Sequence, residues 1–312
     1  MNLLNFVSSY PDEQSCHESF KAYRDKQGVV CSKCGGSNHY WKRDKEQYEC
    51  KKCHTRQSLR SHTVMHGSQL PFRYWFIAMH LLTTTKKSFS ALELQRQLGH
   101  KYYDPIWAML HKLRQAMGTR DELYQLNGTL ELDDGFFSTD TKDEDKEQPR
   151  KRGRGSQRKS KVLVMAESEP VEGQTTKKGK PRKVGHIKML VMDDLKSDTV
   201  TELVEKNVSD ESKIDSDDST SYNKLAEVVE EHKPQVVAKE EINKVLPWVH
   251  LAISNAKRML LDVYHHMSPL YLQSYLNEFC YKFNRRYFGE KLFDRLLMAC
   301  VSHQNNFRYS IR

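Results

Sequence analysis

Two closely spaced pairs of cysteines near the start of the chain constrain its fold more than any other feature. Cys31 and Cys34 form the first pair, Cys50 and Cys53 form the second, and fifteen residues separate the pairs. A C-x2-C-x15-C-x2-C pattern is typical of a site in which four thiolates surround one Zn²⁺, because each short turn supplies two ligands of a tetrahedron. Two disulfides or four unrelated thiols are the alternative. The pattern favours structural Zn²⁺ and a small module stabilised by metal.

Basic and aromatic side chains surround these cysteines. The aromatic residues between the pairs suit the short strands of a zinc ribbon, and a small basic module of this kind more often binds nucleic acid or a protein partner than forms an enzyme core. The aromatic residues are Tyr40, Trp41 and Tyr48, and the basic ones are Lys33, Lys42, Arg43, Lys45, Lys51, Lys52 and Arg56.

The length and charge of the chain bound its class. At 312 residues it has room for about two or three domains. Its net charge of +9 favours an anionic partner, and its basic runs either contact phosphates or form solvated loops. No apolar run is long enough to span a membrane and no secretion signal opens the chain, so we expect a cytoplasmic protein. The remaining cysteines, expected to be reduced thiols, are Cys16, Cys280 and Cys300.

The first 125 residues divide into two predicted domains. Residues 1–65 are interpreted as the zinc ribbon with a short helical lead, and residues 66–125 as a helical domain. Apolar residues at helical spacing predict helices near residues 71–82, 88–99 and 105–118. The short connection between the last two helices and the basic residues of the third fit a helix-turn-helix that binds DNA. A helical spacer is the alternative.

Residues 126–312 change to a mixed pattern of strands and helices. Three strand-like segments are followed by alternating helix and strand and then by two closing helices, which predicts an α/β fold with a mixed sheet flanked by helices. Charged insertions at about 140–160 and 169–185 are interpreted as long connections between the first three strands. The predicted strands are residues 129–137, 161–166, 186–192, 213–217 and 235–238, and the predicted helices are 197–207, 222–232, 247–264 and 270–286.

Two aspartates in this region are candidates for chemistry. Asp133 lies in the first predicted strand, and Asp217 ends a later one. An ionised carboxylate in a buried strand is costly unless it has a partner. Two carboxylates on neighbouring strands could share a hard divalent cation such as Mg²⁺ or Mn²⁺. Each aspartate alone is as readily explained by a capping or turn role.

Several blocks, in a consistent order along nearly the whole chain, make it resemble bacterial insertion-sequence transposases of the ISXO-like group. That group pairs an N-terminal zinc ribbon with a DDE catalytic domain. The resemblance implies an RNase H-like fold for residues 126–312, and residence in the bacterial cytoplasm in association with the nucleoid. The blocks are ELDDGFF at 131–137, GRGS at 153–156, SD at 216–217 with Tyr222, WVHLAISNAKR at 248–258, YHH at 264–266, YLNEF at 275–279 and FNRR at 283–286.

The resemblance also implies site residues. Its first two acidic ligands, which would hold Mg²⁺ or Mn²⁺, fall on Asp133 and Asp217. Many relatives carry Glu at the third position with Lys seven residues later, and here the matching positions are His250 and Lys257. Seven residues are about two helical turns, so these two side chains share one helix face. Asn255 is the alternative third residue, since some relatives use Asn. Further candidates are Glu240 and Glu241.

The expected function is that of a DNA transposase. The resemblance implies binding of the terminal inverted repeats of an insertion sequence, with metal-dependent cleavage and strand transfer by a homo-oligomer on double-stranded DNA. His and Asn supply no charge to a cation, so a site with either is expected to be weaker for Mg²⁺ or more tolerant of Mn²⁺. A non-catalytic DNA-binding regulator with a decayed nuclease domain is one alternative. An RNase H-like nuclease without strand transfer is the other.

Overall fold

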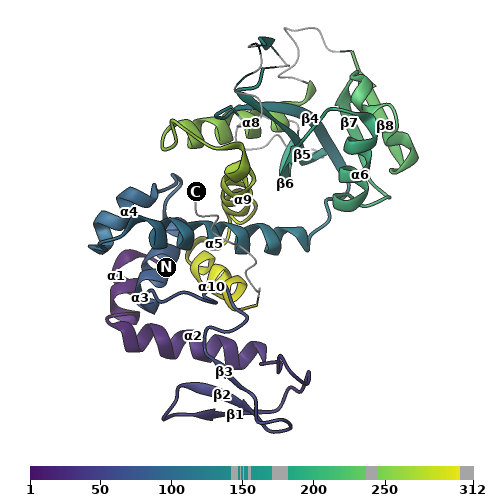
Figure 1. Ribbon diagram of the computed structural model, residues 1–312. Coiled ribbons are helices and arrows are strands. Elements are labelled where there is room, and N and C mark those ends of the chain that lie inside the picture. Colours follow the sequence, from purple (N-terminus) through teal and green to yellow (C-terminus); the bar gives the residue numbers. More distant parts are fainter. Residues whose placement is uncertain are drawn as a thin grey trace. The chain divides into compact units, whose positions relative to one another are not determined.

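The computed structural model describes residues 1–141, 147, 149, 151–153, 156–170, 182–236 and 245–302. The chain forms two compact units (Figure 1). The first unit comprises Met1–Arg120 and Arg285–Arg312, and the second comprises Asp121–Asn284. None of the described helices combines the length and apolar character needed to cross a membrane.

The first unit begins with two helices and the predicted zinc ribbon. The helices are α1 (Leu3–Ser9) and α2 (Glu13–Gln27), and an antiparallel sheet of β1 (His39–Lys42), β2 (Gln47–Cys50) and β3 (Arg56–Ser58) follows them. Asp12 and Ser15 form a capping box at the start of α2, and Gly28, with φ of 85°, ends it.

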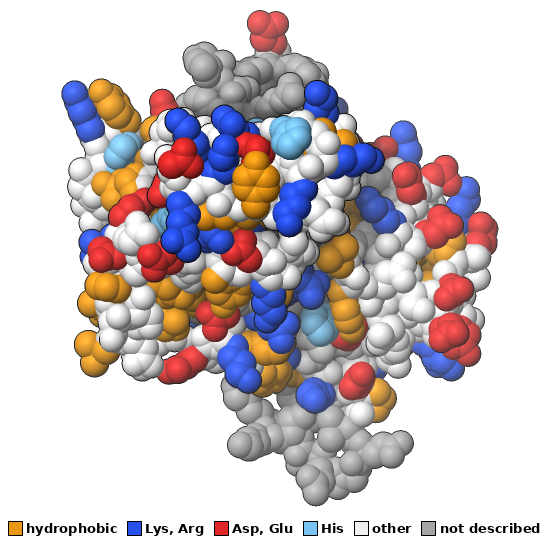
Figure 2. All heavy atoms as spheres, turned by 90° about the horizontal axis from the view of Figure 1, so that it is seen from below, with side chains coloured by type: hydrophobic (Ala, Val, Ile, Leu, Met, Phe, Trp, Pro, Cys, Tyr) orange, Lys and Arg blue, Asp and Glu red, His pale blue; other side chains and the backbone are white. Residues whose placement is uncertain are grey.

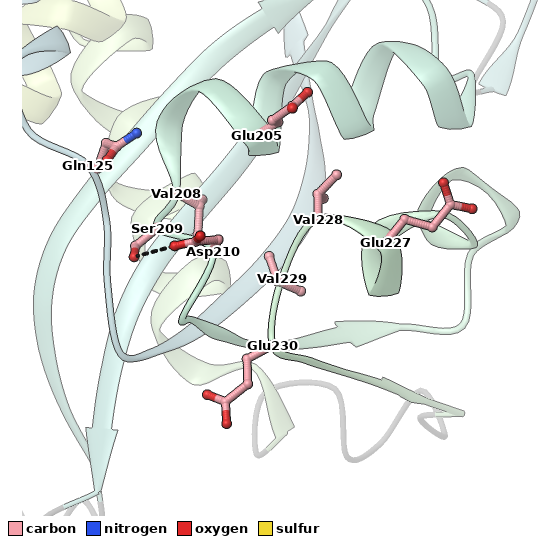
Figure 3. A pocket seen from close by; sticks show the side chains of 9 residues that line it. All are labelled: Gln125, Glu205, Val208, Ser209, Asp210, Glu227, Val228, Val229 and Glu230. Atoms are coloured by element: carbon pink, nitrogen blue, oxygen red, sulfur yellow. Dashed lines mark hydrogen bonds between the residues drawn. The ribbon is translucent and has the colours of Figure 1, made fainter.

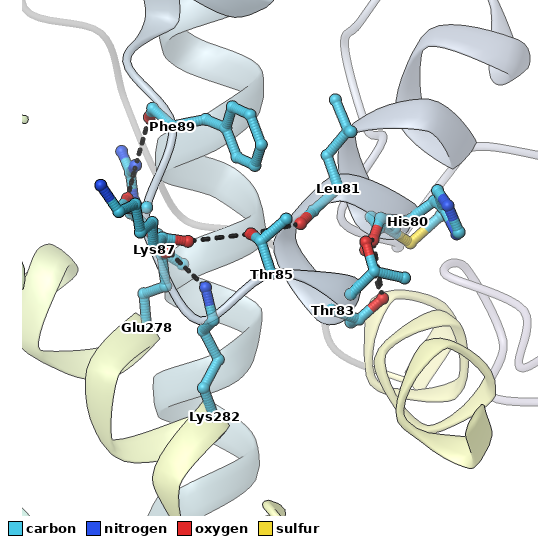
Figure 4. A network of polar contacts seen from close by, with 12 residues as sticks. His80, Leu81, Thr83, Thr85, Lys87, Phe89, Glu278 and Lys282 are labelled. Atoms are coloured by element: carbon cyan, nitrogen blue, oxygen red, sulfur yellow. Dashed lines mark hydrogen bonds and ion pairs between the residues drawn. The ribbon is translucent and has the colours of Figure 1, made fainter. Parts of the chain in front are cut away.

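Three further helices follow close to the predicted positions. They are α3 (Phe72–Thr84), α4 (Ala91–Leu98) and α5 (Tyr103–Glu122). The side chain of Ser90 accepts a hydrogen bond from the first turn of α4, and Gly99 ends this helix in the left-handed conformation. At the end of α3, Thr83 donates to the His80 carbonyl and Thr85 to that of Leu81 (Figure 4). Side-chain hydroxyls therefore satisfy carbonyls of the last turn.

Helix α10 (Leu292–Ser302) returns to the first unit and packs against α2 and α3. Its Phe293 joins an aromatic cluster with Phe6, Tyr10, Phe76 and His80, where ring centroids lie 5.6 to 6.4 Å from that of Phe293. The sequence grouped residues 285–312 with the catalytic domain. In the structure, the apolar face of α10 is buried by side chains from the start of the chain.

The second unit contains a five-stranded mixed sheet in the order β6-β5-β4-β7-β8. The strands are β4 (Thr129–Ser138), β5 (Lys159–Pro170), β6 (Arg182–Met192), β7 (Lys213–Asp217) and β8 (Glu231–Gln235). The first three are antiparallel, whereas β7 runs parallel to β4 and β8 parallel to β7. This arrangement confirms the predicted α/β fold with an RNase H-like mixed sheet and flanking helices.

Helices cover the two faces of this sheet with separate apolar clusters. Helices α8 (Pro247–Leu261) and α9 (Leu272–Asn284) pack on one face, where Phe137 and Val164 are buried. Helix α6 (Ser197–Asn207) and two short 3-10 helices pack on the other face, where Leu132 and Ile214 are buried. Because successive side chains of a strand alternate between faces, odd-numbered residues of β4 face α8.

The structure differs from the predicted elements around residues 222–238. The predicted helix at 222–232 is two short 3-10 helices, η3 (Thr220–Tyr222) and η4 (Leu225–Glu227). Strand β8 begins at Glu231, four residues before the predicted strand, whose residues 237 and 238 lie outside the described part of the chain. It is a polar edge strand containing Pro234, so it lacked the apolar pattern by which strands are recognised.

Candidate metal centres and active site

The four paired cysteines converge on one point in the first unit. The Cys31 and Cys53 sulfurs lie 3.5 Å apart and those of Cys34 and Cys50 lie 3.6 Å apart. All four sulfurs lie within 4.8 Å of one another, and the four residues are free thiols. A tetrahedral Zn²⁺ with bonds of about 2.3 Å would hold its sulfurs about 3.8 Å apart. The geometry therefore fits the predicted zinc site.

Two equivalent turns present these thiols. The Gly35 amide donates to the Cys31 carbonyl and the His54 amide to the Cys50 carbonyl, each at 3.0 Å. Both donors have positive φ values, 68° for Gly35 and 59° for His54. Hydrogen bonding by Thr55 lowers the pKa of Cys53 to about 6, which favours the thiolate that binds metal.

The zinc ribbon packs against helix α2 through two of the aromatic side chains between the cysteine pairs. The Tyr48 hydroxyl donates to Asp25 Oδ1 at 2.6 Å, and Tyr48 is buried. The Lys21 ammonium lies 4.8 Å from the Trp41 ring centroid. These contacts make α2 and the ribbon one module.

Glu49 holds the three strands of the ribbon together. Its carboxylate is buried and contacts Tyr40 on β1, Arg56 Nε on β3 at 2.7 Å, and the Lys42 ammonium at 3.2 Å. The hydrogen bond from Tyr40, followed by that from Arg56, lowers the pKa of Glu49 to about 2. Two of the basic side chains predicted around the zinc site thus have a structural partner. The other basic residues of the set are exposed, and they are Lys33, Arg43, Lys45, Lys51 and Lys52.

The two candidate catalytic aspartates lie on neighbouring parallel strands of the second unit. Leu132 on β4 is paired with Ser216 on β7. Asp133 and Asp217 each follow one residue later, so the strand register places them side by side. Both side chains belong to the face that α8 covers, since the buried Leu132 faces α6. The strand pairing thus brings together two residues that are far apart in the sequence.

Helix α8 brings His250 to Asp133. His250 Nδ1 lies 3.5 Å from Asp133 Oδ2, and the two side chains are 23% and 14% exposed, respectively. Burial lowers the pKa of His250 and therefore favours its neutral form. The further candidates Glu240 and Glu241 lie outside the described residues.

Lys257 lies two turns further along α8, over the Phe137 ring at 5.6 Å from its centroid. Burial is the main cause that lowers the pKa of Lys257; the charge of Lys159 adds to it, and the negative charge of Asp133 opposes it. Asp133 therefore interacts with both His250 and Lys257. Asn255 is half-buried on α8, two residues or about 200° around the helix from Lys257.

Tyr222 contacts the acidic group from the opposite face of the sheet. Its hydroxyl donates to Asp134 Oδ1 at 3.5 Å, and its side chain is only 1% exposed. Burial and the charges of Asp134, Asp133 and Asp217 all raise the pKa of Tyr222. The phenol therefore stays protonated beside three carboxylates. In the sequence, Tyr222 was only a matching position without a role.

Sequence reasoning missed the buried glutamate Glu131, which precedes Asp133 by two residues and shares its face. Its carboxylate is fully buried and reaches the start of α8. Two signals together could have found it. One is a glutamate within an apolar strand, and the other is a helix that begins at Pro247 without a capping side chain of its own.

A pocket of about 630 Å³ in the second unit lies away from these residues (Figure 3). Its lining residues precede β7 and β8, whereas Asp217 ends β7. Carboxylates dominate its rim, which makes it unsuitable for a nucleic-acid phosphate. The acidic lining residues are Glu205, Asp210, Glu227 and Glu230.

Comparison with known proteins identifies two regions. Residues 125–284, over half of the chain, match the ISXO2-like transposase domain, and residues 11–56 match a transposase zinc-ribbon domain. The second match includes α2, in agreement with its packing on the ribbon. No curated protein matches the chain. Among solved structures, the chain is similar to a crystal structure of a pre-cleavage Mos1 transpososome, with 13% identity, a TM-score of 0.30, and coverage of 78% of this chain and 82% of that one.

Proposed function

The chain belongs to the ISXO2-like transposase family, and we propose that it binds the terminal inverted repeats of an insertion sequence and catalyses metal-dependent strand cleavage and strand transfer. The observation that carries the proposal is the group formed by Asp133, Asp217 and His250. The two aspartates end up adjacent on parallel strands, and His250 lies 3.5 Å from one of them. All three lie within the part of the chain that matches the family domain.

In this proposal Asp133 and Asp217 hold Mg²⁺ or Mn²⁺ through carboxylate oxygens. When bound, the cation would activate the attacking oxygen and stabilise the leaving oxygen during in-line displacement at phosphorus. Partial burial of Asp133 keeps water from screening its charge. His250 takes the third position as a neutral imidazole, which is a poorer Mg²⁺ ligand than carboxylate and suits Mn²⁺ better. Asn255 is the alternative for that position.

Lys257 is proposed to bind the DNA phosphate at the cleavage point. Its ammonium lies on the same face of α8 as His250. Burial lowers the pKa of Lys257, and the negative charge of Asp133 opposes this shift. A cationic donor near the reacting phosphate offsets the negative charge that develops in the transition state. Because both element ends must be cut and joined together, we infer that the protein acts as a homo-oligomer on DNA.

We propose that the first unit binds DNA, but that α4 rather than α5 of the expected helix-turn-helix makes the contact. Helix α5 is largely buried, and its Arg114 is 1% exposed and bonded to the Phe89 carbonyl. The outward face of α4, with Arg96 and nearby Lys101 exposed, is therefore the better candidate for DNA contact. Lys and Arg side chains are interspersed with Asp and Glu on the face shown in Figure 2. Counterion release makes such binding strongly salt-dependent.

The experiment that tests the proposal uses the full-length protein and duplexes that carry the ends of its element. Mg²⁺ or Mn²⁺ is expected to produce nicked strands and then joined products, and scrambled ends are expected to produce neither. Specific binding without any cleavage would favour a DNA-binding regulator with a decayed nuclease domain. Cleavage without joining would favour an RNase H-like nuclease.

A further inference from the structure

Glu131 on β4 has a carboxylate that reaches the first residues of helix α8. Its Oε2 accepts hydrogen bonds from the backbone amides of Trp248 at 2.7 Å and Val249 at 3.1 Å. Its Oε1 accepts a hydrogen bond from Ser168 Oγ at 2.6 Å. The side chain is fully buried, and so is that of Ser168. All of these contacts join residues far apart in the sequence.

Helix α8 needs such a partner because it lacks a cap of its own. Leu246 occupies the N-cap position and provides no side-chain hydrogen bond, and Pro247 occupies the first turn. The first amides of a helix have no acceptor within the helix, and the helix dipole makes this end attractive to a negative charge. Glu131 supplies the acceptor from the neighbouring strand. Burial raises the pKa of its carboxyl, whereas the hydrogen bonds from Ser168 and from the amides of Val249 and Trp248 lower it.

We propose that Glu131 is a positioning residue that fixes His250 against Asp133 by holding the N-terminus of α8. The proposal rests on the proposed function of this site. Glu131 precedes Asp133 by two residues on the same strand face, and His250 immediately follows the two amides that Glu131 binds. One side chain thus links the strand that carries the first aspartate to the helix that carries the histidine and the lysine.

The partners of Glu131 are themselves fixed. Glu131 pairs with Asp215 across β4 and β7, two residues before the candidate aspartates on both strands. Arg182 Nη1 donates to Asp215 Oδ2 at 3.1 Å, and its Nη2 donates to the Ser168 carbonyl at 2.8 Å. Ser168 is therefore held from both sides. This buried network gives Glu131 one orientation rather than several.

The chain offers a matched control in Glu167 on β5. Glu167 is also buried, and it accepts hydrogen bonds from two backbone amides, those of Asn127 and His186, and from the Tyr124 hydroxyl. It has no hydrogen bond to α8 among those of the described residues. Glu167→Gln therefore tests the loss of a comparable buried carboxylate without touching the anchor of α8.

The test compares full-length wild type, Glu131→Gln and Glu167→Gln by hydrogen exchange and by cleavage. In Glu131→Gln, the amides of residues 248–249 are expected to exchange roughly 10- to 100-fold faster, because hydrogen bonds to a charged acceptor are replaced by weaker ones. The turnover rate on duplex element ends in Mn²⁺ is expected to fall about 10- to 100-fold at an unchanged half-saturating DNA concentration, because the reacting groups are misplaced. Glu167→Gln is expected to match wild type at both readouts.

Unchanged exchange at residues 248–249 in Glu131→Gln would overturn the proposal, as would faster exchange with unchanged turnover. A fall in DNA affinity alone would also overturn it. If Glu131→Gln does not fold, Ser168→Ala decides the question: smaller changes of both readouts support the proposal, and wild-type values overturn it. A wild-type protein without metal-dependent cleavage would refute the proposed function instead, and the exchange comparison would still decide whether Glu131 holds α8.

Discussion

His250 Nδ1 on helix α8 lies 3.5 Å from Asp133 Oδ2 on strand β4. Burial favours the neutral imidazole, so the contact joins a carboxylate to an uncharged nitrogen rather than to a cation. A glutamate at the same position would bring a second negative charge next to Asp133. The histidine therefore gives this cluster less negative charge than a glutamate at the same position would.

The third site position can be tested by substitution of His250 and Asn255. If His250 has this role, His250→Ala is expected to lower cleavage about 100-fold or more while DNA binding persists, and Asn255→Ala is expected to cost much less. His250→Glu is expected to retain activity and to shift the preference from Mn²⁺ toward Mg²⁺, because carboxylate is the harder ligand. Cleavage rates in each metal are the measurement. Normal cutting by His250→Ala together with an inactive Asn255→Ala would assign the role to Asn255.

Asp133→Asn and Asp217→Asn are each expected to abolish detectable cleavage. Each change removes one negative charge from the proposed cation site and alters little of the DNA-binding surface. Asp134→Asn is the matched control, because Asp134 faces Tyr222 on the other side of the sheet and should leave cleavage within a few fold of wild type. Gel assays of cleavage and of binding separate the two effects. Equal losses of cleavage in all three variants would mean that an aspartate need not lie on the α8 face of the sheet to be required for cleavage.

Removal of two zinc ligands is expected to unfold the ribbon. Cys50→Ser combined with Cys53→Ser leaves two thiolates, which cannot complete the tetrahedron, and structural zinc supplies folding free energy to small modules. Metal analysis of purified wild type should give one Zn²⁺ per chain, and the double variant should give none. Cys16→Ala, which lies outside the cluster, should retain zinc. Zinc retained by the double variant would show that these thiols are not the ligands.

Acid is expected to destabilise the first unit through His111 on α5. Burial, followed by the charge of Arg114, lowers the pKa of His111 to about 3, whereas an unfolded histidine has a pKa of about 6.5. Between these values the unfolded state binds a proton that the folded state does not. The free energy of unfolding therefore falls by about 1.4 kcal/mol for each pH unit below about 6.5.

Denaturant unfolding of full-length variants between pH 7 and pH 5 measures this dependence. His111→Gln should show a shallower loss of stability with falling pH than wild type. His265→Gln, which changes an exposed histidine, should follow the wild-type curve. Parallel curves for wild type and His111→Gln would exclude His111 as the cause of the acid sensitivity.

Local signals in the sequence determined much of the fold. The four-cysteine spacing predicted the zinc ribbon, and the sulfur geometry fits it. Helix α6 occupies the predicted residues 197–207, and α4 (Ala91–Leu98) lies within the predicted helix at 88–99. The order of strands and helices along the chain predicted a mixed sheet, and the structure contains one. Capping, ligand spacing and apolar periodicity act over a few residues, so they can be read along the chain.

Tertiary structure alone decided the contacts that connect distant segments. The packing of α10 with α2 and α3, the polar edge strand β8 and the burial of Arg114 within the helical domain carry no short-range pattern. The capping of α8 by Glu131 is of the same kind, because its donors and acceptor come from opposite ends of the domain sequence. Sequence identified Asp133 and Asp217 as candidates, but only the parallel pairing of β4 with β7 places them side by side. Periodicity specifies which face a residue occupies, whereas the packing of a strand against a helix decides what that face meets.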